Sequence, residues 1–214
     1  MSKPNRSEFT KKEWQIIQVH RTPRDVQRFL STFPYNSEYE GGTLRSFRET
    51  VKRGEAHCLE AALTAAVILE QYDYPPLLLS FESQDKLDHV VYLFRQRGQW
   101  GSIGRSGYVG LNGRRPVFRN VRQLVWSYFD PYIDYTGRII GYAVTNLNAL
   151  GRYNWRFSSK NVWKVENHLR EIQHHPLRSS NRRYEKVLDR FKKFKEKNPD
   201  ELPSHFENRN LWMI

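Results

Sequence analysis

The clearest pattern of apolar positions lies in residues 58–71, which read CLEAALTAAVILEQ. A helix that is apolar nearly all round is buried in the protein. The prolines of YDYPP, residues 72–76, end this helix because proline cannot continue one. The sequence therefore predicts a buried helix that begins at Cys58. One face of it is marked by residues at three- and four-residue spacing: Leu59, Ala62, Leu63, Ala66 and Val67.

After this helix the pattern changes to short runs rich in β-branched and aromatic residues, which favour strands. RQRG, residues 95–98, has the composition of a hairpin turn. Further helices are predicted at 23–31, 44–53 and 121–130. Helices followed by an antiparallel meander indicate an α+β fold. The predicted strands are 77–81 (LLLSF), 89–94 (HVVYLF), 99–103 (QWGSI) and 139–144 (IIGYAV).

The last part of the chain differs in composition. Residues 152–214 carry 15 Lys and Arg against 8 Asp and Glu, whereas residues 1–151 carry 20 against 15. Helical spacing predicts helices at 159–174 and 181–197. We therefore expect a core of residues 1–151 and a basic helical extension, residues 152–214, that packs on it.

Composition excludes several classes of protein. Cys58 is the single cysteine of 214 residues, so an intrachain disulfide and a cysteine-rich zinc module are excluded. The N-terminus is polar, and the longest apolar stretch, residues 61–69, is far shorter than a membrane span. These features predict a cytoplasmic protein that is not bound to a membrane.

Cys58 is the strongest candidate for chemistry. It lies where the buried helix begins, and the positive end of a helix stabilises a thiolate. Backbone N–H groups at the same end can bind an oxyanion. His89, which opens a predicted strand, is the candidate base. The alternative is that Cys58 is simply a small buried residue of the core.

A resemblance favours the catalytic interpretation. GEAHCLEAALTAA, then PPLLLSFES, then LDHVVYLFRQRGQWGSIG, about residues 50–106, resemble the catalytic half of the transglutaminase-like superfamily. The resemblance implies a papain-like fold in which a cysteine-bearing helix packs on an antiparallel sheet. It also implies that Cys58 is the nucleophile, that His89 is the base and that no cofactor is needed.

The chain departs from that family at one position. The family's acid would fall at Gly104, and Ser102 and Ser106, which share its face, carry no charge. Asp88 should point away from His89's face, and Glu60 in the first helical turn complements the helix dipole. The sequence thus predicts a Cys–His dyad whose imidazole is oriented by a hydroxyl, a backbone carbonyl or a distant carboxylate.

Other motifs carry weaker signals. His57 is a competing base only if it lies outside the helix, and we expect it to belong to the preceding loop. His168, His174 and His175 have no metal-ligand spacing and are expected at the surface, so no metal site is predicted. Residues 101–107 (GSIGRSG) lack the ending of a phosphate-binding loop.

Two functions remain open from the sequence. The first is a transglutaminase-like cysteine hydrolase or acyltransferase that acts on an amide or ester of a protein, peptide or small molecule. The second is a catalytically silent module on the same fold. A net charge of +12 favours an acidic partner for such a module, and the aromatic residues among the C-terminal cations keep nucleic acid open as that partner.

Overall fold

The computed structural model describes residues 3–39, 41–84, 89–201, 211 and 213, and it has a mixed α+β architecture. In this part of the chain six strands form one antiparallel sheet in the order β4-β3-β2-β1-β5-β6. The strands are β1 (Leu77–Ser83), β2 (His89–Gln96), β3 (Gln99–Ile103), β4 (Arg114–Phe118), β5 (Ile139–Asn146) and β6 (His175–Pro176).

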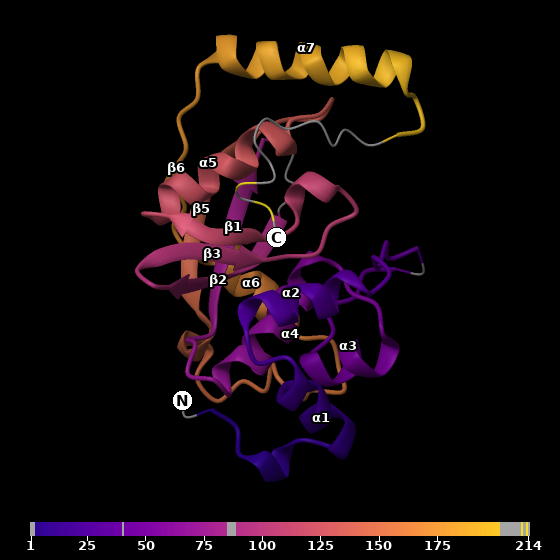
Figure 1. The fold of residues 1–214 in the computed structure, drawn as a ribbon, viewed down its shortest axis with the longest axis vertical. Helices are drawn as coiled ribbons and strands as arrows, with labels where there is room; N and C mark the ends of the chain where they lie inside the picture. Colours follow the sequence, from indigo (N-terminus) through magenta and orange to yellow (C-terminus); the bar gives the residue numbers. More distant parts are fainter. Residues whose placement is uncertain (1–2, 40, 85–88, 202–210, 212, 214) are drawn as a thin grey trace.

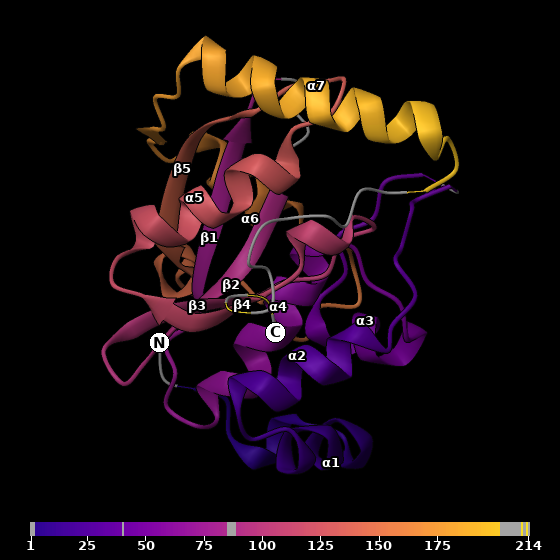
Figure 2. The ribbon, with the colours of Figure 1, turned by 45° about the horizontal axis from the view of Figure 1, so that its top comes forward.

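Helices cover both faces of this sheet (Figure 1). Side chains of α1–α4 and α6 pack on one face, and those of α5 and α7 pack on the other. Figure 2 shows the same arrangement from another side, with α7 lying across α5. The helices are α1 (Lys11–Val19), α2 (Pro23–Ser31), α3 (Phe47–Arg53), α4 (Cys58–Glu70), α5 (Val121–Tyr132), α6 (Trp163–Glu171) and α7 (Asn181–Lys197), with 3₁₀ turns η1 (Arg6–Glu8), η2 (Val109–Leu111) and η3 (Leu147–Leu150).

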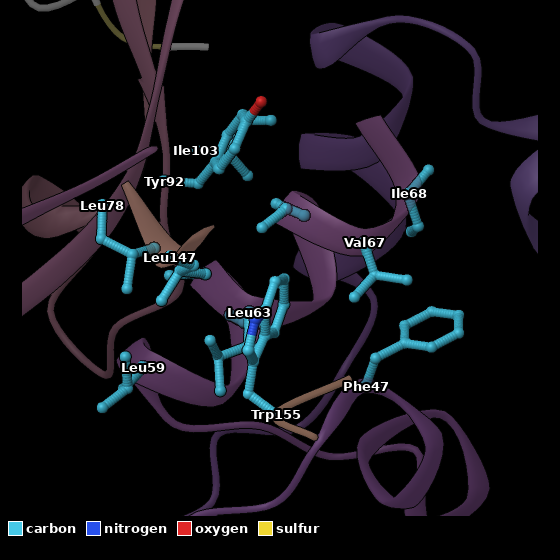
Figure 3. Packing of buried hydrophobic residues seen from close by; sticks show 14 of the residues in the cluster. Phe47, Leu59, Leu63, Val67, Ile68, Leu78, Tyr92, Ile103, Leu147 and Trp155 are labelled. Carbon is cyan, nitrogen blue, oxygen red and sulfur yellow. The ribbon is translucent and has the colours of Figure 1, made fainter. Parts of the chain in front are cut away.

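The helix α4 is the centre of the larger core. All its residues after Cys58 are buried, as the nearly uniform apolar sequence predicts. Figure 3 shows Leu63 and Trp155, which both belong to this core and are both wholly buried. The Ala-rich sequence lets neighbouring helices and the sheet approach α4 closely, which fixes where its N-terminus lies.

The strand β2 divides the two cores by the two-residue period of its side chains. Val90, Tyr92 and Phe94 belong to the cluster around α4. Val91 and Leu93 belong to the cluster around α5. Both faces of β2 are therefore buried, which explains its continuous apolar sequence.

The predicted elements agree with the structure where the pattern is strong. The helices at 23–31 and 181–197 have the predicted bounds, and α4 ends one residue earlier than predicted. The helix expected at 159–174 is shorter, because Val162 and Ile172 have non-helical backbones. The strand β4 was not predicted, since Arg-Arg-Pro has little strand character.

Parts of the basic C-terminal segment are built into the body of the protein. Trp155, Val165 and Leu169 lie in the core cluster of α4, and β6 pairs with β5. Val187 of α7 lies in the cluster of α5. The division of the chain at Gly151 stays a prediction, and an extension would share its core with the first 151 residues.

The longest apolar stretch of the sequence is far shorter than a membrane span. Among the residues that the structure describes, none of the helices has both the length and the apolar character that crossing a bilayer requires.

Candidate active site

Cys58 is the first residue of α4, and His57 is its N-cap with an extended backbone. His57 therefore lies outside the helix. This meets the condition, inferred from the sequence, under which its side chain can act on Cys58. Its ring atom Nδ1 accepts a hydrogen bond from Leu59 N–H at 3.2 Å, and Nε2 lies 2.9 Å from the carbonyl oxygen of Thr43. An imidazole thus takes the capping role that Ser, Thr, Asp or Asn usually fills.

Glu60 completes this capping arrangement from inside the protein. Its carboxylate is wholly buried and accepts the N–H of His57 at 3.1 Å. It also accepts the N–H of Arg45 at 3.0 Å and hydrogen bonds from the side chains of Asn36 and Thr43. These hydrogen bonds offset the cost of burying the carboxylate. They also connect the loop before α3 to the start of α4.

His89 is the first residue of β2, and its ring is held on several sides. It stacks on Phe81 with ring centroids 5.8 Å apart and planes 15° apart, and Tyr128 lies on another side at 6.1 Å. Its Nε2 atom lies 2.9 Å from the carbonyl oxygen of Leu111. Because a carbonyl only accepts, Nε2 carries the proton and Nδ1 is left to act on Cys58.

The structure brings Cys58 and His89 together, and His57 joins them. Burial acts to raise the pKa of the Cys58 thiol, but hydrogen bonds with the side chains of His57 and His89, and the charges of both, lower it to about 5. Cys58 itself is half-buried. A thiol with this pKa is a thiolate at neutral pH, which is the reactive form.

His57 responds in the opposite direction. Burial acts to lower its pKa, but the hydrogen bond with Cys58 and the negative charges of Cys58, Glu60 and Glu38 raise it to about 9. Protonation at Nδ1 exchanges the cap on Leu59 N–H for a bond to the thiolate. The pair Cys58–His57 therefore favours the charged forms of both residues.

A cavity of about 750 Å³ is lined in part by Thr43, whose carbonyl oxygen contacts the His57 ring. It is lined largely by polar side chains, among them Tyr35, Asn36 and Thr43. Burial and the charge of Cys58 raise the pKa of Tyr35, which keeps its hydroxyl protonated as a hydrogen-bond donor. The cavity therefore offers donors and acceptors for a polar molecule along the loop before α3, and Cys58, His57 and His89 are not among its lining residues.

The described positions that the sequence offered for a third catalytic residue are engaged in other hydrogen bonds. Gly104 exchanges two hydrogen bonds of 3.0 Å with the side-chain amide of Gln27. Ser102 Oγ lies 2.7 Å from the hydroxyl of Tyr128, and Ser106 Oγ accepts the N–H of Tyr108. Asp88 lies outside the described residues. Among the described residues, a backbone carbonyl, that of Leu111, contacts the far side of His89, which is one of the options that the sequence left open.

The other histidines are dispersed. His168 contacts the hydroxyl of Thr145 at 2.8 Å, and His174 lies 3.4 Å from Ser80 Oγ. Within the described ranges, no three His, Cys, Asp or Glu side chains are grouped closely enough to bind a metal ion.

Sequence reasoning did not single out Leu111, Arg114 or Tyr128, which surround His89's hydrogen bond. The contact of Leu111 is made by its backbone, so no side-chain pattern marks it. A run of Arg-Arg-Pro that follows a glycine-rich loop gives no sign that Arg114 is buried.

Comparisons with known proteins give little further information. The chain matches none of the known family models and none of the curated proteins. Among solved structures it is similar to Legionella pneumophila LapG, with 11% sequence identity and a TM-score of 0.38. The similarity covers 68% of this chain and 88% of that protein.

Proposed function

We propose that this protein is a transglutaminase-like cysteine hydrolase or acyltransferase that acts on an amide or ester. The observation that supports this most is the placement of the Cys58 thiol at the start of a buried helix, hydrogen-bonded to two imidazoles that lower its pKa to about 5. The resemblance of residues 50–106 to the transglutaminase-like superfamily points to the same chemistry.

The proposed reaction has two steps. The Cys58 thiolate forms a bond to the substrate's carbonyl carbon, and the C–N or C–O bond breaks as protonated His89 gives its proton to the leaving amine or alcohol. Water or an amine then attacks the thioester while His89 takes its proton, and the thiolate leaves. The N–H of Cys58, the first residue of α4, lies at the helix end that carries the thiol and is the proposed donor for the oxyanion.

An activated ester tests this proposal. p-Nitrophenyl acetate should acetylate wild-type protein at Cys58, as intact mass and peptide mapping would show, and release nitrophenol repeatedly. Cys58→Ala should abolish the adduct, and His89→Ala should slow turnover by about 10²- to 10⁴-fold. His175→Ala, at an exposed position, is the matched control and should behave as wild type. Equal acetylation of wild type and Cys58→Ala would refute the proposal.

The outer face of α7 favours a second candidate function, a binding module without catalysis. Its apolar residues, such as Val187, pack toward α5, and cations recur on the opposite side at spacings of four, seven and four residues. This exposed basic stripe suits the phosphates of a nucleic acid. The stripe consists of Arg182, Lys186, Lys193 and Lys197.

Salt dependence tests this second function. Full-length protein should bind a fluorescent single-stranded oligonucleotide, with an affinity that falls steeply between 50 and 200 mM salt, as phosphate contacts require. Reversing the charge of Lys186 and Lys193 should weaken binding, whereas reversing Lys11 and Lys12 on α1 should not. Absence of binding at low salt would exclude nucleic acid as the partner.

A further inference from the structure

We propose that Arg114 and Tyr128 are positioning residues of the candidate active site: they fix the turn that presents the backbone carbonyl of Leu111 to His89, on the side of the imidazole where a catalytic triad has its acid. The inference rests on the proposed function for its catalytic meaning. The arrangement of the turn, however, can be tested without any substrate.

The first argument is the geometry at Gly104. A Cβ atom at this position would lie 3.5 Å from the Leu111 oxygen and 2.8 Å from Cγ1 of Val91. A contact of 2.8 Å is too short for two carbon atoms, so a side chain at position 104 requires Val91 to move. A side chain at position 104 would therefore start 3.5 Å from the Leu111 oxygen, the atom that lies 2.9 Å from His89 Nε2.

The second argument is how firmly the turn around Leu111 is held. The guanidinium of Arg114 is wholly buried and donates to the carbonyl oxygens on both sides of Leu111, to Gly110 at 2.6 Å and to Asn112 at 2.7 Å. It also donates to Gly113 at 3.3 Å. Arginine carries several donors in a rigid plane, and this geometry suits a set of converging carbonyls.

Tyr128 links this turn to the imidazole itself. Its hydroxyl donates to the same Asn112 carbonyl at 3.0 Å and contacts Ser102 Oγ at 2.7 Å. Its ring lies 3.7 Å from the Arg114 guanidinium carbon and 6.1 Å from the His89 ring. Burial lowers the pKa of Arg114 to about 10, so the guanidinium remains charged at neutral pH and keeps its donors.

A carbonyl in this place has a chemical consequence. It fixes the tautomer and orientation of His89, as the acid of a triad does. It carries only a partial charge, so it stabilises a protonated His89 less than a carboxylate would. The second imidazole, His57, also stabilises the thiolate, which offsets the absence of an acid behind His89.

The experiment compares Tyr128→Phe and Arg114→Lys with wild type, with Tyr92→Phe as the matched control. Tyr92 is also buried on the sheet and donates its hydroxyl to a backbone carbonyl, that of Pro75, away from the site. Two readouts are taken: the ¹⁵N NMR signals of the His89 ring, and the pH profile of Cys58 alkylation by iodoacetamide.

In wild type, we expect a slowly exchanging Nε2–H on His89. In Tyr128→Phe and Arg114→Lys, this proton should exchange faster, and alkylation at pH 5.5 should fall about 3- to 10-fold, as expected for the loss of one orienting hydrogen bond. Tyr92→Phe should change neither readout. If Arg114→Lys does not fold, Tyr128→Phe decides alone.

The outcomes separate this inference from the proposed function. Wild-type NMR signals and alkylation in both variants would overturn the positioning role, whether or not His89→Ala impairs catalysis. If His89→Ala leaves alkylation unchanged, the proposed function fails. A loss of the protected Nε2–H in Tyr128→Phe would still support the arrangement of the turn.

Discussion

The thiol of Cys58 lies between two imidazoles that reach it from different parts of the chain. His57 precedes it directly and caps its helix, whereas His89 comes from β2 and is fixed by the carbonyl of Leu111. His57 also contacts the buried Glu60 carboxylate, whose oxygen lies 3.7 Å from Nε2. The Leu111 carbonyl thus orients the His89 ring. The Thr43 carbonyl and Glu60 orient the His57 ring, whose Nδ1 atom caps Leu59 N–H.

A substitution that keeps the cap but removes the imidazole separates the two contributions. Asn is a good N-cap residue, so His57→Asn should leave α4 intact. Because His89 remains, the pKa of Cys58 should rise from about 5 to roughly 6–7, still below that of a free thiol. Thiolate absorbance at 240 nm, with Cys58→Ser as the blank, measures this. An unchanged midpoint would mean that His57 only caps the helix.

At the scale of elements, α4 shows what a sequence can and cannot predict. Its bounds and burial follow from residues 58–71, because an all-apolar helix has only the interior to occupy. His89 at the start of β2 follows from the strand pattern. The partner of His89 could not be predicted, since a backbone carbonyl is presented by the path of the chain and every residue type has one. The hydrogen bonds of Arg114 arise in the same way from a turn that only tertiary packing defines.

The start of α4 depends on the buried carboxylate of Glu60. Glu60→Gln replaces an acceptor oxygen by an amide donor that faces other donors, including the N–H of Arg45 or of His57. We expect a loss of about 1–3 kcal/mol in the free energy of unfolding, measured by urea denaturation. The matched control is Glu49→Gln in the first turn of α3, which should cost less than ~0.5 kcal/mol. Equal losses in the two variants would contradict the role given to Glu60.

At the scale of the whole molecule, the sheet separates two cores that draw on distant parts of the chain. Trp155, Val165 and Leu169 pack in the same cluster as α4, although more than eighty residues separate them from Leu63. The shift to a basic composition near Gly151 therefore does not coincide with an edge of this core. The basic composition reflects the residues that face water. The apolar residues before and after position 151, in contrast, pack together in one core.

Truncation tests how the chain divides. A chain that ends at residue 151 lacks Trp155 and the apolar face of α6, so we expect it to lose its cooperative thermal transition in circular dichroism. A chain that ends at residue 179 keeps both and loses only α7 and the segment after it, so it should unfold cooperatively at a lower temperature. A cooperative transition of the 1–151 chain near the full-length midpoint would show instead that these residues form a self-contained core.

The most direct test of the central claim is the pH profile of Cys58 alkylation in wild type and His89→Ala. With the pKa of Cys58 lowered to about 5, the thiolate forms as the pH rises through that value. Alkylation by iodoacetamide should therefore be half-maximal near pH 5 and level through neutral pH. His89→Ala should move the midpoint upward, because the thiolate loses one of its two imidazoles. Identical profiles for the two proteins, or a wild-type midpoint at or above about 8.5, the value of a free thiol, would contradict the account.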